Sequence, residues 1–201
     1  MNYLVKVPLN TTQVQHDCLV ALQKLFSRVC NSIAPTVQQS RNWNRVTLHH
    51  LLYRKLRDSY PELGSQMVCN AIYSVSRASR LVFQHPASAL KLSRDHSGPL
   101  PLLRFRDNCP VYFDRHTLSL KGRELSLFTL EGRMRFAMAL QAKEQELFLS
   151  KKLRVIVLSQ PTGEQFEIAF VFSDPDDLEK LDATASNNGD LPHYLTVEEP
   201  A

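Results

Sequence analysis

The most informative side chains of this 201-residue sequence are basic residues interleaved with aromatic ones. Arginine and lysine neutralise phosphates and aromatic rings stack on unpaired bases, so the combination suits nucleic-acid binding. The interleaving is densest around residues 43–57 and 102–135. The candidate nucleic-acid-binding residues are Trp43, Arg45, Tyr53, Arg54, Arg57, Arg77, Arg80, Arg104, Arg106, Arg115, Lys121, Arg123, Arg133, Arg135, Lys151 and Lys152.

Arginines two residues apart occur twice in the strand-like part of the chain, at Arg104 and Arg106 and at Arg133 and Arg135. Alternate residues of a strand point to one face, so each pair is expected to form a cationic face. Such a face can follow a phosphate backbone, but the solvent side of any sheet is polar as well. Phosphate binding and an ordinary solvated surface are therefore both open interpretations.

Recognisable catalytic and metal-binding patterns do not occur in the sequence. His49 and His50 are adjacent, and neighbouring helical side chains point about 100° apart, so these two do not readily hold one ion. The four cysteines are far apart and form no C-x-x-C pair. No G-x-S-x-G or G-x-x-x-x-G-K motif is present. We therefore expect no catalytic residue, metal or cofactor in this chain.

The net charge of +4 hides two oppositely charged parts. Residues 174–201 carry eight acidic side chains against one lysine, so residues 1–173 hold the excess of positive charge. A body this basic favours a polyanionic partner, most commonly nucleic acid, while a solubilising surface is the plainer explanation. The acidic segment itself is expected to be a flexible tail.

Composition, with 43% hydrophobic and 22% charged residues, is that of an ordinary globular protein. The first residues do not form a basic segment followed by an apolar run and a cleavage site. No window approaches about 18 uninterrupted apolar residues. We therefore expect a cytoplasmic protein without a membrane partner.

Helical periodicity dominates the first half of the chain, after a strand-like run at residues 3–9. Apolar residues then recur every three or four positions, which predicts an amphipathic helix that Thr11 or Thr12 caps and Pro35 ends. The elements expected next are a loop at 36–46, a helix from Thr47 to the Tyr60-Pro61 turn, a helix from Ser65 to Val82 and a connector at 85–101.

Alternating apolar and polar residues predict strands in the second half, including a meander with basic turns between Cys109 and Leu130. Because one strand precedes the helices, we expect an α+β fold: a small antiparallel β-barrel with a helical bundle inserted after the first strand. Residues 1–9 and 100–173 would form the barrel, 10–99 the inserted helical domain and 174–201 the tail. The expected strands are 102–106, 111–114, 117–120, 124–130, 133–140, 153–159 and 165–172, with a helical or irregular piece at 141–148.

Two segments resemble a known family. The first, Arg54 to Arg80 (RKLRDSYPELGSQMVCNAIYSVSRASR), resembles the helical recognition region of the TnpB family, the transposon-encoded RNA-guided nucleases related to compact type V CRISPR effectors. The second, Phe113 to Phe136 (FDRHTLSLKGRELSLFTLEGRMRF), is similar to the family's wedge domain, where a Ser-Leu pair leads through a basic turn into another strand. The resemblance covers about Tyr3 to Phe172, in the family's own order.

The resemblance implies a wedge-like β-barrel interrupted after its first strand by a helical recognition domain. In that family these regions hold the guide-RNA scaffold and read a short motif beside the target, so structured guide RNA and target DNA are the implied partners. Family nucleases continue into a RuvC-like domain with three acidic metal ligands, and no such set is recognisable here. We therefore expect a chain that is non-catalytic by itself, with any RuvC-like nuclease subunit supplied separately.

Two other interpretations stay open. In the first, the chain is a structural or assembly subunit whose basic surface docks an acidic protein, and the acidic tail competes for that surface within the chain. In the second, the chain is an inactive transposon remnant. The RNA-binding interpretation further predicts that cations from the inserted helices and from the barrel converge into one continuous groove.

Overall fold

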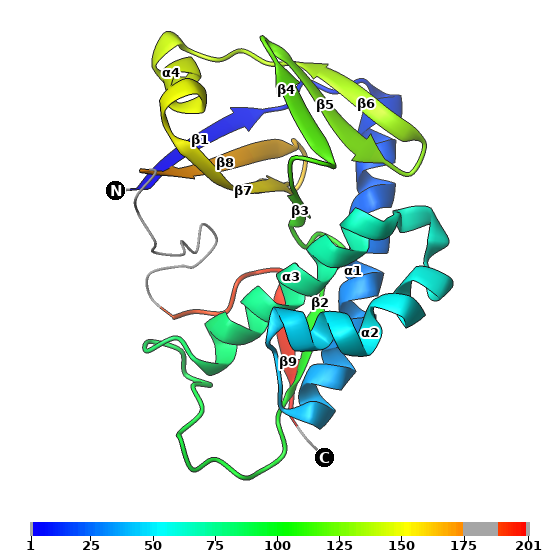
Figure 1. Cartoon of the computed structure of the whole chain (residues 1–201), viewed down its shortest axis with the longest axis vertical. Coiled ribbons are helices and arrows are strands. Elements are labelled where there is room, and N and C mark those ends of the chain that lie inside the picture. The colour runs from blue at the N-terminus through cyan, green and yellow to red at the C-terminus, as the bar shows by residue number, and fades with distance from the viewer. Residues whose placement is uncertain (1, 175–188, 200–201) are drawn as a thin grey trace. The chain divides into compact units, whose positions relative to one another are not determined.

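The computed structural model describes residues 2–174 and 189–199, which divide into two compact units (Figure 1). The long insertion between the two segments of unit 1 supplies most of unit 2. In the described residues, unit 1 comprises 2–22 and 110–174, and unit 2 comprises 23–109 and 189–199.

A four-stranded antiparallel sheet forms the centre of unit 1. Its inner strands are β8 and β7, which form the hairpin that the sequence predicts. Val5 and Val7 of the N-terminal strand and Phe170 of β8 are buried. The sheet order is β1 (Asn2–Pro8), β8 (Glu167–Ser173), β7 (Lys152–Ser159) and β3 (Val111–Phe113).

A three-stranded antiparallel meander follows β3 in unit 1. The sequence predicts a meander between Cys109 and Leu130, but the first strand of that segment, β3, pairs with β7, and the meander continues instead into residues 132–137. Its strands are β4 (Leu118–Lys121), β5 (Glu124–Thr129) and β6 (Gly132–Ala137). Gly122 and Gly132 lie at the two connections with φ of 59° and 103°, a backbone region that residues with a Cβ rarely adopt. These glycines therefore permit the tight turns that bring basic residues to the ends of the strands.

The expected piece at 141–148 is a helix, α4 (Ala142–Ser150). Gln141 and Glu144 form a capping box at its start, where each side chain accepts from the other residue's backbone N–H. The Phe148 ring packs edge-on against Phe170 and Phe172, at centroid distances of 5.0 and 4.8 Å. This contact attaches α4 to the four-stranded sheet.

The first helix is longer than the sequence predicts. Thr12 caps it as expected, because Thr12 Oγ1 accepts from the Gln15 N–H, but α1 (Gln13–Ser40) continues through Pro35. The predictions that Pro35 ends the helix and that 36–40 is loop were wrong. Proline removes one helical hydrogen bond at a cost of about 3 kcal/mol. Burial of Val37 and the 3.0 Å bond from Gln38 Nε2 to the Leu100 carbonyl hold the final turn.

Helices α2 (Arg45–Ser59) and α3 (Ser65–Phe83) pack together in unit 2, joined by the short 3-10 helix η1 (Pro61–Leu63). The predicted Tyr-Pro end of α2 and the Ser65 start of α3 are confirmed. The predicted cap at Thr47 was wrong. Asn44 Oδ1 caps α2 instead by accepting from the Val46 and Thr47 amides at 2.9 and 3.2 Å, so the cap lies three residues earlier than expected.

A two-stranded ladder also belongs to unit 2: β2 (Leu102–Phe105) pairs antiparallel with β9 (Leu195–Glu198). The expectation of a tail without strands was therefore wrong for 195–198. The expected tail at 175–188 lies outside the described residues. A four-residue strand in an acidic segment has little signal of its own and depends on its partner strand.

The fold is mixed α and β with antiparallel sheets, as expected. None of the sheets in the described residues closes on itself, so the small barrel is not seen. The two units also do not coincide with the expected domains, because β2 lies in the unit that holds α2 and α3.

Candidate nucleic-acid interface

The solvent face of the meander is formed by the alternate residues of its three strands. Leu125 and Leu127 of β5 are buried, which turns Ser126 to the opposite face. The strand register places Ser126 between Ser119 of β4 and Arg135 of β6. Small hydroxyl side chains thus lie beside long cations, a surface that a phosphate group can approach closely.

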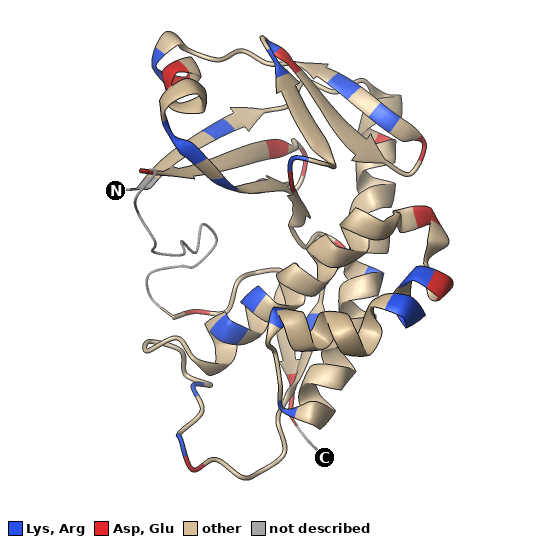
Figure 2. Cartoon of the chain, in the orientation of Figure 1, with Lys and Arg blue, Asp and Glu red and all other residues tan. Residues whose placement is uncertain are grey.

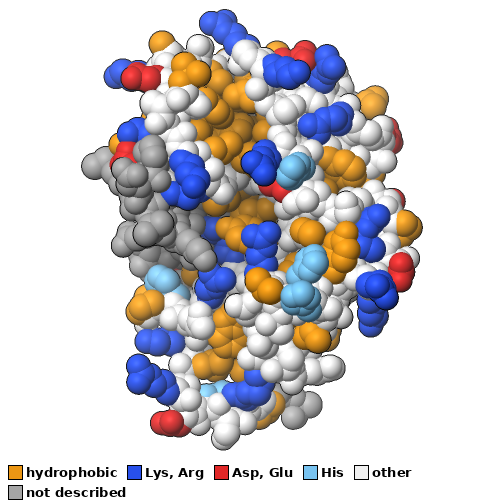
Figure 3. Space-filling view, viewed as in Figure 1, with side chains coloured by type: hydrophobic (Ala, Val, Ile, Leu, Met, Phe, Trp, Pro, Cys, Tyr) orange, Lys and Arg blue, Asp and Glu red, His pale blue; other side chains and the backbone are white. Residues whose placement is uncertain are grey.

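Arg133 extends from β6 across this face. Its Nη1 lies 3.5 Å from the His116 carbonyl oxygen, and its Nη2 lies 3.5 Å from Ser119 Oγ. Residue 133 pairs with Phe128 of β5, whose ring is partly exposed. Figure 2 shows further basic residues on β6 and at the β4–β5 turn, and Figure 3 shows basic side chains over the same part of the surface.

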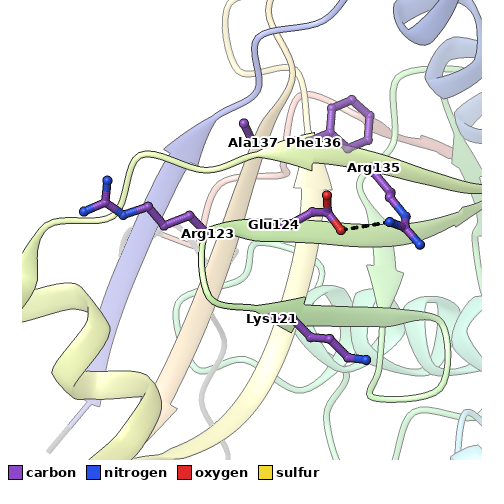
Figure 4. Close-up of a pocket in the computed structure, with 6 residues that line it drawn as sticks. All are labelled: Lys121, Arg123, Glu124, Arg135, Phe136 and Ala137. Carbon is purple, nitrogen blue, oxygen red and sulfur yellow. Dashed lines mark ion pairs between the residues drawn. The ribbon is translucent and has the colours of Figure 1, made fainter.

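An open surface pocket of about 350 Å³ lies at the β4–β5 turn (Figure 4). Arg135 Nη1 and Glu124 Oε1 lie 3.2 Å apart there, with side chains 73% and 54% exposed. An ion pair this exposed contributes at most about 1 kcal/mol, so a phosphate can compete for the arginine. Arg123 extends away from the pair in the close-up view. The lining residues are Lys121, Arg123, Glu124, Arg135, Phe136 and Ala137.

The turn before β4 holds Arg115 outward. Asp114 Oδ1 accepts from the backbone N–H groups of His116 and Thr117 at 3.0 and 3.1 Å, which fixes the turn by a local side-chain bond. Arg115 and His116 are exposed at its tip. Asp114 therefore stabilises the turn. The turn also adds Arg115 to the cations of the meander.

A second set of predicted residues gathers in unit 2, around Tyr73 of α3. The Arg45 guanidinium carbon lies 5.5 Å from the centroid of the Tyr73 ring, and that of Arg77 lies 6.0 Å away. Arg77 Nη1 also donates to the Tyr73 hydroxyl at 2.9 Å. Arg77 is only 8% exposed, whereas Arg45 is exposed. The two arginines differ accordingly: one belongs to the core and the other to the surface.

The predicted aromatic residues of unit 2 are partly exposed and packed on neighbours. The Tyr53 ring stacks on His49 with centroids 4.6 Å apart, one helical turn away. Trp43 lies 5.4 Å from the Phe83 ring, and its carbonyl accepts from Ser76 Oγ at 2.7 Å. The rings of His49 and His50 lie 6.0 Å apart and nearly perpendicular. On the same helix, Arg54 is exposed and Arg57 is half-buried.

Several predicted residues already hold partners within the chain. Arg104 Nε donates to Glu198 Oε1 at 2.9 Å, and Lys151 Nζ bonds Asp174 and lies 4.9 Å from the Tyr3 ring centroid. The hydrogen bond from Lys151 lowers the pKa of Asp174, and the same bond raises the pKa of Lys151. The remaining predicted residues are exposed surface cations: Arg80, Arg106 and Lys152.

Sequence reasoning missed four residues that shape these sites. Ser119, Ser126 and Phe128 were overlooked, although strict alternation along β4 and β5 places them on the same face as the predicted cations. Tyr73 was missed because it reads as one more residue of an amphipathic helix. Its signal is the i, i+4 spacing to Arg77.

Two features are absent from the described residues. No three of their His, Cys, Asp or Glu side chains are grouped so that they could hold a metal ion. None of their helices is both long enough and apolar enough to cross a membrane. Comparison with known proteins found no matching family model and no matching curated protein.

Proposed function

We propose that this chain binds structured RNA, with the solvent face of the meander as its main phosphate-binding surface. One observation carries the proposal: five cations outnumber three acidic side chains, Asp114, Glu124 and Glu131, on this meander and its turns, and Asp114 already accepts from the backbone amides of its own turn. The cations are Arg115, Lys121, Arg123, Arg133 and Arg135, all exposed.

The side chains of this face contribute to RNA binding in different ways. The guanidinium groups of Arg133 and Arg135 donate paired hydrogen bonds to phosphate oxygens, and Lys121 acts as a point charge. Ser119 and Ser126 leave room for close approach of the backbone. The partly exposed Phe128 ring offers a stacking surface for an unpaired base. Arg45, Tyr53, Arg54 and Arg57 form a second, weaker contact surface on α2.

The resemblance of Arg54–Arg80 and Phe113–Phe136 to TnpB proteins supports a narrower proposal. The RNA is then a guide scaffold, and the chain also takes part in target-DNA recognition, with base pairing by the guide supplying sequence choice. A wedge-like barrel would be the corresponding architecture of unit 1. Any cutting would come from a RuvC-like nuclease partner, and this chain is assigned binding without catalysis.

The test compares two double variants with the same change of charge. Arg133→Ala with Arg135→Ala should lower affinity for a structured RNA by roughly ten- to a hundredfold, about 1.4 kcal/mol per tenfold. It should also reduce the slope of log K against log salt by about 1.4–2, because two phosphate contacts are lost. Lys24→Ala with Arg28→Ala removes two exposed cations of α1 and should change both quantities little.

Equal effects of the two double variants would show that net charge alone drives binding, and would end the proposal for the meander. Absence of RNA binding by the parent at moderate salt, with tight binding of an acidic polypeptide instead, would favour the assembly-subunit interpretation. Thermal melts of both variants exclude unfolding as the cause.

A further inference from the structure

Both edges of the β2 strand form hydrogen bonds: one edge with side chains of α1, and the other with the strand β9. Asn31 of α1 bonds both backbone groups of Phe105: Nδ2 donates to the carbonyl and Oδ1 accepts from the amide, each at 2.8 Å. Ser27 Oγ donates to the same carbonyl at 3.0 Å. A carboxamide that makes this pair of bonds replaces the strand that would otherwise lie there. β2 is therefore fixed to α1 independently of β9.

The opposite edge of β2 receives β9. Backbone groups of a strand alternate in direction, so those of Arg104 and Arg106 face β9 when those of Phe105 face α1. The 2.9 Å bond from the Arg106 amide to the Tyr194 carbonyl agrees with this alternation. Arg104 lies opposite Thr196 in the register.

Side chains of the β9 segment make two kinds of contact, one buried and one at the surface. Tyr194 and Leu195 are 6% and 4% exposed, and Leu195 lies opposite the buried Phe105. Glu198, on the outward side, accepts from Arg104 at 2.9 Å. The β9 segment therefore contacts β2 through its own aromatic–aliphatic pair and through a carboxylate three residues later.

The ladder between β2 and β9 is short. It has four register pairs and, among the described residues, no third strand. A two-stranded ladder is marginal in water, so most of the binding of β9 comes from Tyr194 and Leu195. Local opening of such an element requires less free energy than global unfolding.

We propose that β2 is a receptor strand for one extended peptide. β9 occupies it within the chain, and an extended acidic peptide of a partner protein with the same pattern, aromatic–aliphatic–polar–apolar–acidic, occupies it when β9 leaves. The binding mode is strand addition, in which backbone bonds supply affinity and alternate side chains supply specificity. This proposal does not depend on RNA binding.

The experiment uses the full chain and a fluorescein-labelled peptide with the sequence of residues 190–199. Leu195→Asp within the chain places a charge in the buried position and should release β9. The peptide should then bind this variant at least tenfold more tightly than it binds the parent, because the attached strand no longer competes. Leu191→Asp is the matched control, since Leu191 is 41% exposed and lies before the ladder, and it should leave peptide affinity at the parent value.

A charge exchange tests the position of the peptide. Arg104→Glu, added to Leu195→Asp, should weaken binding about fivefold or more, and a peptide with Glu198→Arg should recover it. Peptide binding that ignores both changes would overturn the assignment to β2, as would no binding to a Leu195→Asp chain that melts like the parent.

A second variant and a second measurement guard against misfolding of Leu195→Asp. Thr196→Pro removes a backbone N–H directed at β2 while it keeps Tyr194 and Leu195, and it should also raise peptide affinity. In the parent, amides of 195–198 should exchange hydrogen at least tenfold faster than those of the α3 core. Exchange of both at one common rate would show that β9 is an inseparable part of the unit, and would contradict the proposal.

Discussion

The meander of unit 1 and the α2–α3 pair of unit 2 use the same residue types in different surroundings. On the meander, Arg133 and Arg135 are exposed and reach polar atoms at distances of 3.2–3.5 Å. On α3, Arg77 is buried, bonds the Tyr73 hydroxyl and lies over its ring. An exposed guanidinium is available to a ligand, whereas a buried one stabilises the fold. Residue type alone therefore does not identify a binding residue.

The largest difference between the two regions is expected in stability. Arg77→Ala should lower the free energy of unfolding by about 2–3 kcal/mol, because it removes a bond to Tyr73, a ring contact and buried methylene groups. Arg135→Ala should change it by no more than about 0.5 kcal/mol. Urea unfolding of both variants measures the contrast. Equal losses would abolish the distinction between core and surface arginines.

A smaller difference is expected in nucleic-acid affinity. Arg54→Ala with Arg57→Ala should weaken RNA binding and flatten its salt dependence, but by less than the meander double variant. Arg57 is half-buried, so fewer of its donors reach a ligand than those of Arg133 and Arg135. Filter-binding titrations at several salt concentrations rank the two surfaces. The reverse order would move the main site to α2.

Within unit 1, Lys151 differs from the meander cations because it forms an ion pair with Asp174. The contribution of this pair to stability depends on pH. Lys151 lowers the pKa of Asp174 from 3.8, so this contribution to stability is present above that value and is lost as pH falls through the lowered pKa. The raised pKa of Lys151 makes its contribution present below 10.5 and lost as pH rises through the raised value.

The corresponding variant is Asp174→Asn. It should lower the melting temperature slightly between pH 5 and 9, and the difference from the parent should shrink below about pH 3.8. Melting curves across this range measure it. A difference that stays constant down to pH 2 would show that the carboxylate's charge is not what stabilises the pair.

Local signals in the sequence predict much of this structure, and tertiary partners account for the rest. The three strands of the meander follow from alternation along 118–137, and α3 follows from its apolar periodicity. The pairing of β3 with β7 does not follow from alternation. The extension of α1 past Pro35 depends on burial of Val37 and on a bond to Leu100, neither of which lies in the helix pattern. Strand β9 exists only because β2 lies beside it.

The candidate site divides in the same way. Arg133 and Arg135 are predictable as a pair because two-residue spacing fixes their common face. The partner of Arg104 is 94 residues away in the sequence, and the burial of Arg77 depends on how α3 packs. Neither could be inferred from spacing, because both are properties of tertiary contacts.

Ultraviolet crosslinking of the intact protein to a structured RNA, followed by mass spectrometry of the crosslinked peptides, locates the bound strand without any substitution. RNA adducts should concentrate on residues 115–136, with Phe128 among the modified positions, and a weaker set should fall on 43–57. Adducts confined to other segments, or none at moderate salt, would contradict the assignment of the meander as the RNA-binding surface.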